Sequence, residues 1–288
     1  MRGVLPLLLL LLAACSPAPA PLISGAAHPP MWLAERDGTR LYLLGAVHAL
    51  PSGVDWQDAR VRAAIAGSNR LLLELAPDEL ARAAPIAERM ARDEPVPSLT
   101  ARIGSAAAAQ LADYTGIDEG DADRQESWAL SLLLGNARAQ AWGLSGDNGV
   151  ETVLRAKFRA DGKPISGLET AQDQLRAFDD IDPARQARAL TLSLAEGDSA
   201  RAHTVALLRA WATGNDGELG RIATADLART PWIIEPLVTR RNRAWASALA
   251  GMRGTILVAV GSGHLVGQDN LPDLLAAQGF RVRALPAR

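Results

Sequence analysis

Two apolar runs of this chain end in the same short motif, and this repeated feature constrains the fold most strongly. The runs are residues 41–44 and 256–260, and each leads into Gly-x-x-His, as Gly45 to His48 and Gly261 to His264. A short apolar run without alternation is typical of a strand buried on both faces of an α/β sheet. Such sheets form their sites at the carboxyl ends of strands, and glycine allows a sharp turn or a close approach there. We therefore expect both histidines at one edge of one sheet.

Acidic residues mark two further predicted strands. Glu74 interrupts the apolar run of residues 70–75, and Glu169 ends residues 163–169. A carboxylate near the end of a buried strand is costly unless it is paired, hydrogen-bonded or bound to a cation. Two imidazoles with one or two carboxylates predict a site for a divalent metal. The alternative is that each histidine is a hydrogen-bonded structural residue, but two of only four histidines sharing one motif favours a common site.

The order of the predicted elements indicates the fold class. Asp37-Gly38 predicts a hairpin between residues 30–36 and 39–44. Each Gly-x-x-His strand is followed by a loop, a helix and a strand, which is a pattern compatible with internal duplication. These helices cover residues 55–66 and 271–278, and those of the middle section cover residues 77–92, 99–114, 122–142, 149–160, 170–179, 183–195, 199–213, 217–227 and 235–249. We predict an α/β fold with a central mixed sheet built from both ends of the chain, a large helical middle section, and the motifs at strand carboxyl ends.

The N-terminus carries the marks of export. Residues 4–14 are apolar but short for a membrane span, and Leu12-Ala13-Ala14-Cys15 resembles the lipobox of bacterial lipoproteins. We predict a signal peptide over residues 1–14, a lipid-anchored proline-rich tether over 15–30 and one domain over 31–288. The alternative is an ordinary secretory signal with an incidental Cys15. An aspartate directly after the lipidated cysteine retains some lipoproteins at the inner membrane. This chain has Ser16 at that position, which favours the outer membrane. The predicted location is the bacterial cell envelope, with the domain facing the periplasm.

Composition excludes several classes of function. Cys15 is the only cysteine, so the exported domain has no internal disulfide. A net charge of −2 gives no indication of a nucleic-acid partner. The sequence has no Gly-x-Ser-x-Gly, His-Glu-x-x-His, Walker or dinucleotide-binding motif.

Three polar residues have both a structural and a functional interpretation. Glu151 opens a helix, where the helix dipole favours an acid whatever its function; alternatively, Glu151 is an additional residue of the site. Residues 240–243 are rich in arginine, which is typical of a solvated helix face. Alternatively, one arginine with the neighbouring Asn242 reaches the site, where a guanidinium binds a carboxylate or a developing oxyanion. Trp211 and Trp245 have the spacing of core residues, and His28 and His203 lie outside any motif.

Together these motifs resemble the TraB/GumN family, which is related to the Tiki metalloproteases and, more remotely, to erythromycin-esterase-like and ChaN-like proteins. The resemblance extends from Trp32 to Leu285. Its marks are the two Gly-x-x-His motifs, Leu50-Pro51, Leu73-Glu74-Leu75, Gly149-Val150-Glu151, Leu168-Glu169-Thr170 and Arg241-Asn242.

The resemblance implies a metal-dependent hydrolase of the peptidase type. His48, Glu74 and His264 would bind a divalent ion such as Mn, Co or Zn. The resemblance gives Glu169 a supporting place. From the chemistry of the residues, we expect Glu169 to act as general base, and Arg241 with Asn242 to position the substrate, a peptide or small molecule, or to stabilise the oxyanion. Two alternatives remain: a non-enzymatic lipoprotein that binds a peptide signal or haem, and a degenerate hydrolase that keeps only the scaffold.

Overall fold

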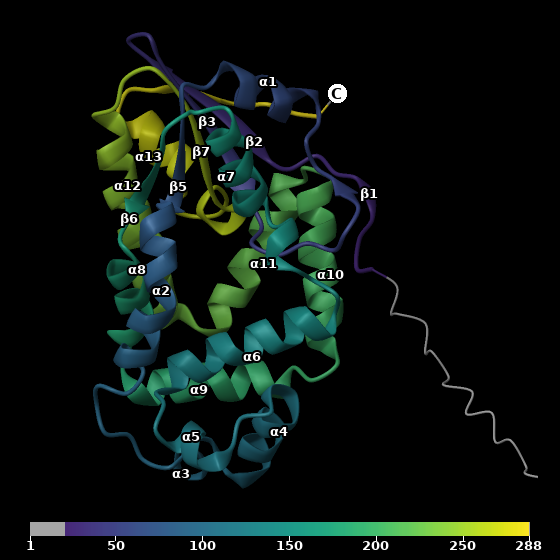
Figure 1. Cartoon of the computed structure of the whole chain (residues 1–288), viewed down its shortest axis with the longest axis vertical. Coiled ribbons are helices and arrows are strands. Elements are labelled where there is room, and N and C mark those ends of the chain that lie inside the picture. Colours follow the sequence, from purple (N-terminus) through teal and green to yellow (C-terminus); the bar gives the residue numbers. More distant parts are fainter. Residues whose placement is uncertain (1–20, 288) are drawn as a thin grey trace, which may run out of the picture.

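The computed structural model describes residues 21–287 and has a six-stranded sheet at one end (Figure 1). The predicted signal peptide and Cys15 lie outside the described residues. The strand order is β6-β5-β7-β3-β2-β8. The strands are β2 (Met31–Arg36), β3 (Thr39–Ala46), β5 (Arg70–Leu75), β6 (Ile165–Glu169), β7 (Thr255–Gly261) and β8 (Arg281–Ala284). This arrangement confirms the prediction of an α/β fold whose sheet comes from both ends of the chain.

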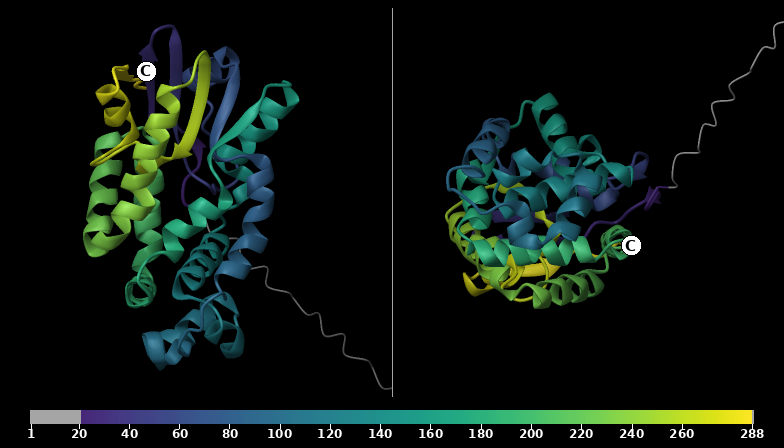
Figure 2. Two further views of the ribbon diagram at one scale, coloured as in Figure 1. Left: turned by 90° about the vertical axis from the view of Figure 1, so that its left-hand side faces the viewer. Right: turned by 90° about the horizontal axis from the view of Figure 1, so that it is seen from below.

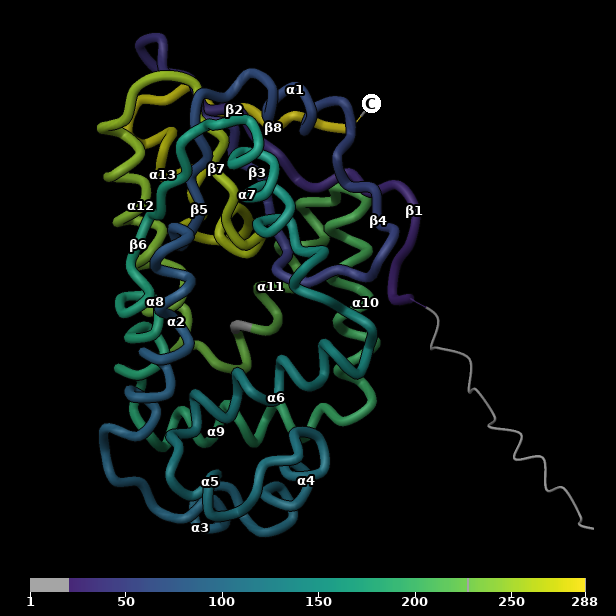
Figure 3. Tube along the Cα trace, in the orientation of Figure 1, coloured from purple at the N-terminus to yellow at the C-terminus, as the bar shows by residue number. Residues whose placement is uncertain are grey.

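Four neighbouring strands are parallel, so their carboxyl ends meet at one edge. β6 pairs with β5, β5 with β7, and β7 with β3, all in parallel. β2 is antiparallel to both β3 and β8. The β2–β3 turn is the predicted Asp37-Gly38, and both residues have positive φ, 48° and 76°, as a tight hairpin of right-handed twist requires. Figure 3 follows the N-terminal and C-terminal strands side by side in this sheet.

Both faces of the sheet are buried. Successive side chains of each central strand point to opposite faces, so a single strand contributes to two apolar clusters. In β5, Leu71 and Leu73 belong to one apolar cluster and Leu72 to the other. The first cluster includes side chains from α1 (Ala59–Gly67), α7 (Val150–Ala160) and α10 (Ser199–Ala212). The second includes side chains from α11 (Asp216–Arg229), α12 (Arg240–Ala250) and α13 (Leu271–Ala277). Helices on both faces explain why the strand sequences are unbroken apolar runs (Figure 2).

The remaining helices extend from the carboxyl edge of the sheet (Figure 1). They are α2 (Pro77–Met90), α3 (Leu99–Ile103), α4 (Ser105–Thr115), α5 (Glu119–Asp123), α6 (Ser127–Ala141), α8 (Ala171–Asp179) and α9 (Pro183–Ala195). Leucines of α3, α4, α6 and α9 form a separate apolar cluster away from the sheet. Within residues 21–287, no helix has the length and apolar character needed to cross a membrane.

Three helices predicted as continuous are broken or modified. Residues 99–114 divide at Gly104, whose φ of 84° no α-helix contains. Residues 122–142 divide between α5 and α6, and residues 235–249 begin with a π-helix, Glu235–Thr239. Periodicity predicts the presence of a helix better than it predicts where the helix begins and ends.

The two Gly-x-x-His units share the order strand, helix, strand. After the first motif, α1 leads to β5, which is parallel to β7 and therefore runs in the same direction as β3. After the second motif, α13 leads to β8, which is antiparallel to β2 and therefore runs in the same direction as β7. The helices α1 and α13 contribute to apolar clusters on opposite faces of the sheet, and internal duplication stays a prediction.

The N-terminal end of the described chain packs on the domain. Leu22 and Ala27 are buried in the first apolar cluster, and β1 (Gly25–Ala26) pairs with β4 (Val54–Asp55). The packed part of the chain therefore begins before residue 31, within the segment predicted as a tether.

Candidate functional site

The two Gly-x-x-His motifs lie side by side at the carboxyl edge of the sheet. The parallel register pairs Ala46 with Gly261, and the hydroxyl of Ser262 donates to the carbonyl of Ala46 over 2.8 Å. A Cβ on Gly45 would approach the Ser262 Oγ to 2.9 Å, so the glycine permits this close contact. The indole N–H of buried Trp211 fixes the Gly45 carbonyl over 2.8 Å. The two motifs are thus parts of one structural unit.

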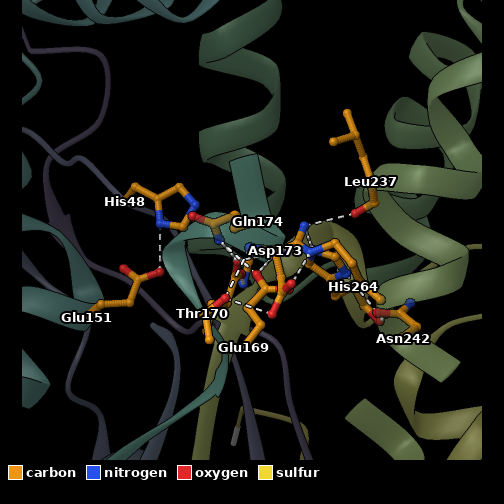
Figure 4. Close-up of polar contacts among 12 residues, drawn as sticks. His48, Glu151, Glu169, Thr170, Asp173, Gln174, Leu237, Asn242 and His264 are labelled. Carbon is orange, nitrogen blue, oxygen red and sulfur yellow. Dashed lines mark hydrogen bonds and ion pairs between the residues drawn. The ribbon is translucent and has the colours of Figure 1, made fainter. Parts of the chain in front are cut away.

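Helix α7 brings a carboxylate to the first histidine. Its N-terminal Gly149 lies against the backbone of His48, where a Cβ would come within 2.1 Å of the His48 carbonyl oxygen. The N–H of Val150 donates to the Val47 carbonyl over 3.1 Å. Because of this contact, the Glu151 Oε1 lies 2.7 Å from the His48 Nδ1 (Figure 4). Glu151 therefore contacts a predicted site histidine as well as opening the helix.

The carboxylate strongly affects the protonation of His48. The Glu151 contact and its charge raise the pKa of His48 to about 9, and the charge of Glu74 contributes in the same direction. The imidazole is nevertheless 74% exposed because it lines an open pocket, so this ion pair contributes little to stability. With Nδ1 directed at Glu151, the Nε2 of His48 is the nitrogen that is available to a ligand.

His264 has the opposite environment. It is buried, its Nδ1 lies 2.7 Å from the amide oxygen of Asn242, and its ring packs on Trp245 with centroids 4.5 Å apart. An amide oxygen only accepts, so Nδ1 carries the proton and Nε2 keeps its lone pair. Burial lowers the pKa of His264 to about 4, assisted by the charge of Arg241 and opposed by Glu74. His264 is therefore neutral at physiological pH.

Arg241 joins the two acidic strand ends. Its guanidinium lies 2.7 Å from the Glu74 Oε2 and contacts both oxygens of Glu169, at 2.6 and 3.0 Å. Its third nitrogen is 3.2 Å from the His264 Nε2. The side-chain amide of Gln174 on α8 donates to both Glu74 and Glu169 over 3.0 Å (Figure 4). This buried network satisfies the two carboxylates, as their burial requires.

The two carboxylates respond differently to this network. Burial opposes ionisation of Glu74, but His264, Arg241, His48 and the N–H of Gly261 together lower its pKa. Burial and the charge of Glu74 raise the pKa of Glu169, although Arg241 opposes the shift. Both oxygens of Glu169 are occupied by the guanidinium, which makes this residue a support for Arg241.

Three of the predicted site side chains border one small space above Gly261. A Cβ at this glycine would lie 3.2 Å from the Glu74 Oε1, 3.6 Å from the His264 Cδ2 and 4.0 Å from the His48 Nε2. Two imidazoles whose Nδ1 atoms each lie 2.7 Å from a side-chain oxygen, and one carboxylate, are donor types that suit a divalent transition metal. The donor chemistry therefore fits such an ion.

Although the donor types suit a metal ion, the donor atoms are not yet arranged around one common position. Among residues 21–287, no group of three or more His, Cys, Asp or Glu side chains is already arranged to hold a metal ion. The guanidinium of Arg241 occupies the lone-pair side of His264 and one oxygen of Glu74. Arg241 is thus the group that an incoming cation has to displace from His264.

A pocket of about 470 Å³ opens beside this space. Site residues, leucines and further polar residues line this pocket. They are His48, Leu73, Glu74, Leu75, Leu80, Gly146, Asp147, Glu151, Thr152, Arg155 and Gln174. A larger cavity, of about 540 Å³, lies between α3, α6 and α9. Polar groups that line this cavity hydrogen-bond to one another: Arg102 donates to Ser127, and Gln186 donates to Glu126. We therefore place the site in the smaller pocket.

Most residues expected from the sequence meet at this edge. Glu74, Glu169, Arg241 and His264 form one network directly or through Gln174, and Asn242 supports His264. His48 contacts Glu151, and its Nε2 borders the same space above Gly261. Gln174 was not expected, although its helix directly follows the strand that ends at Glu169. Trp245 was expected in the core, and it also carries the Arg241 guanidinium 4.6 Å from its ring centroid. His28 and His203 lie outside the site, paired with Asp58 and Asp226.

The fold and site define an α/β protein in which paired Gly-x-x-His motifs and two glutamates share one sheet edge. The chain belongs to the TraB/PrgY/gumN family, whose model matches residues 30–284. It is similar to the uncharacterized protein YbaP of Escherichia coli (strain K12) and to its counterpart in Shigella flexneri, with 26% identity over 170 residues in each case. The alignment covers 57% of this chain and 62% of each relative, which is less than two thirds of their length. No solved structure matches the chain.

Proposed function

We propose that this protein is a metal-dependent hydrolase of the peptidase type. The observation that supports it most is the gathering of His48, Glu74 and His264 around Gly261. These three side chains would hold one divalent ion. A bound Mn, Co or Zn ion would supply Lewis acidity, which makes water reactive near neutral pH.

The remaining residues have supporting roles in this proposal. Glu151 and Asn242 lie at the Nδ1 atoms of the two imidazoles, so that each Nε2 faces the site. The Nε2 of neutral His264 has a lone pair, whereas a bound ion would displace the proton that His48 carries on Nε2 near neutral pH. Arg241 binds the substrate carbonyl oxygen and stabilises negative charge that develops on it. Glu169 holds Arg241 through both oxygens, and we assign it this positioning role in place of the general-base role expected from the sequence.

Peptide cleavage after controlled metal loading tests this function. The full-length protein is stripped with EDTA, reloaded with Mn, Co or Zn, and incubated with a fluorogenic peptide library. We expect cleavage with at least one metal, and its loss in His48→Ala, Glu74→Gln and His264→Ala. His203→Ala is the matched control, since this histidine pairs with Asp226 outside the site.

Two outcomes would contradict the proposal. One is a folded, metal-loaded protein that cleaves no peptide, and the other is cleavage that persists at the same rate in all three site variants. Tight retention of an uncleaved peptide, or a Soret shift with haem, would instead support a binding lipoprotein.

We also propose that the chain is exported and carries lipid on Cys15. The support is the sequence alone, through the apolar residues 4–14 and the lipobox-like residues 12–15. Membrane fractionation of wild type and Cys15→Ala tests it. Recovery of both proteins in the same soluble fraction would contradict lipid anchoring.

A further inference from the structure

In the part of the chain that the structure describes, one arginine of the pocket beside His48 has no carboxylate partner. Arg155 on α7 lines this pocket, is half-buried, and donates to the hydroxyl of Thr152 over 3.0 Å. Within residues 21–287, Arg155 forms no ion pair, whereas Arg241 in the same site contacts two carboxylates. A guanidinium has five N–H donors in a planar fork, so most of those of Arg155 are available to a ligand.

The other charges of the pocket do not neutralise Arg155. Glu74 pairs with Arg241, and Glu151 pairs with His48. Asp147 is exposed, and in the described part of the chain no ion pair joins its carboxylate to Arg155. Among the described residues that line this pocket, Arg155 is therefore the cation that is free to recognise an anion, and a carboxylate matches its fork geometry.

Helix geometry places Arg155 close to the site histidine. Glu151 and Arg155 are four residues apart on α7, so their side chains lie on one face about 5–6 Å apart at Cβ. Glu151 contacts His48 directly. An extended peptide advances about 3.3–3.6 Å per residue, so one helical turn corresponds to one or two peptide residues. When a peptide binds with one of its peptide bonds at His48, a carboxylate of the same peptide that contacts Arg155 therefore lies within one or two residues of that bond.

Leucine side chains complete the pocket between these polar groups. Leu73, Leu75 and Leu80 line it, and Leu80 is 43% exposed, which makes it one of the few large apolar side chains exposed in the described chain. Apolar surface next to a charged anchor favours a ligand that has an apolar side chain adjacent to its anionic group.

We infer that Arg155 is a specificity-determining residue that selects peptides with a carboxylate close to the cleaved bond and an apolar residue beside it. The statement that a peptide bond is cleaved rests on the proposed function. Recognition of the carboxylate by Arg155 requires only binding. The carboxylate can come from a free C-terminus or from an acidic side chain, and both present the same planar group to Arg155.

Binding of three matched peptides by calorimetry tests this inference without requiring catalysis. The probes are acetyl-Leu-Ala amide, acetyl-Leu-Ala acid and acetyl-Leu-Glu amide, which carry no carboxylate, a terminal one and a side-chain one. We expect at least one acid to bind about tenfold or more tightly than the neutral amide, since hydrogen bonds to charged groups are among the stronger ones. Whichever acid is preferred identifies the source of the carboxylate.

Three variants assign the preference to the guanidinium. It should disappear in Arg155→Met, persist partly in Arg155→Lys, and be unchanged in Arg159→Met, which alters another arginine of α7 that does not line the pocket. Equal binding of all three probes, binding of none, or a preference that survives Arg155→Met would overturn the inference. A preference that is retained by a protein that cleaves no peptide would refute the proposed function alone.

Discussion

The same four-residue motif places its histidine in two different environments. His48 is 74% exposed, contacts a carboxylate and has its pKa raised to about 9. His264 is 8% exposed, contacts an amide and has its pKa lowered to about 4. In both, Nδ1 is engaged and Nε2 is left to the site. The motif thus fixes the position of each histidine at the sheet edge, whereas partners from α7 and α12 set its protonation.

Substitution of Arg241, which is buried beside His264, should have the largest effect on the free energy of unfolding. Arg241→Met should destabilise the fold by about 3–5 kcal/mol, since it leaves Glu74 and Glu169 buried without their cation. Urea denaturation measures this change. The adjacent Arg240→Met is the control, because Arg240 is exposed and 3.9 Å from Asp180. Equal effects of the two substitutions would show that the buried network does not stabilise the fold.

The two histidines should affect stability with opposite dependence on pH. The folded pKa of His264 lies below its unfolded value of 6.5, so the unfolded state binds more protons between these values. Stability is therefore lost as pH falls from 6.5 to about 4, by up to about 3 kcal/mol. The pKa of His48 is raised, so its contribution is present below 6.5 and lost as pH rises to about 9.

Denaturation midpoints between pH 4 and pH 9 measure this opposition when EDTA is present throughout. His264→Gln should flatten the acid side of the profile, and His48→Gln the alkaline side. The same change of profile in both variants would contradict the assigned environments.

Glycine substitutions should separate the regions further. Gly149→Ala should destabilise the protein by about 1–3 kcal/mol, because its Cβ would meet the His48 carbonyl oxygen at 2.1 Å. Gly263→Ala, inside the second motif, should have a much smaller effect, since nothing lies within 4 Å of that Cβ. Thermal unfolding of the two variants compares them directly. A larger effect at Gly263 would show that α7 does not pack on the first motif in this way.

Glu151→Gln should have the smallest effect on stability, below about 1 kcal/mol, because the His48 side chain is mostly exposed. It should nevertheless lower the pKa of His48 from about 9 towards 6.5. NMR titration of the imidazole protons measures this shift, and the His264 signal is the internal control. An unchanged pKa of His48 would mean that Glu151 is only a helix-capping acid.

Much of this site could be predicted from the sequence because strand ends are marked by local patterns. The apolar runs before Gly45 and Gly261, and the acids at Glu74 and Glu169, identify the edge. Parallel pairing then brings together residues that are more than 200 positions apart, such as Ala46 and Gly261.

The partners of the histidines depend on packing between distant segments. The contact of Glu151 with His48 requires the approach of Gly149 to the His48 backbone, which no local pattern encodes. Gln174 and Trp245 look like ordinary helix residues in the sequence, and only the arrangement of α8 and α12 directs them to Arg241. The break at Gly104 was likewise hidden, since glycine within an apolar periodicity also occurs inside helices.

Binding of Mn²⁺ is the most direct measurement of the central claim, that both Gly-x-x-His motifs serve a single metal site. Titration of EDTA-stripped protein with Mn²⁺, followed by electron paramagnetic resonance, should show one class of site that is lost in His48→Ala and in His264→Ala, but kept in His203→Ala. Failure to bind Mn²⁺, Co²⁺ or Zn²⁺, or binding that survives both site substitutions, would contradict it.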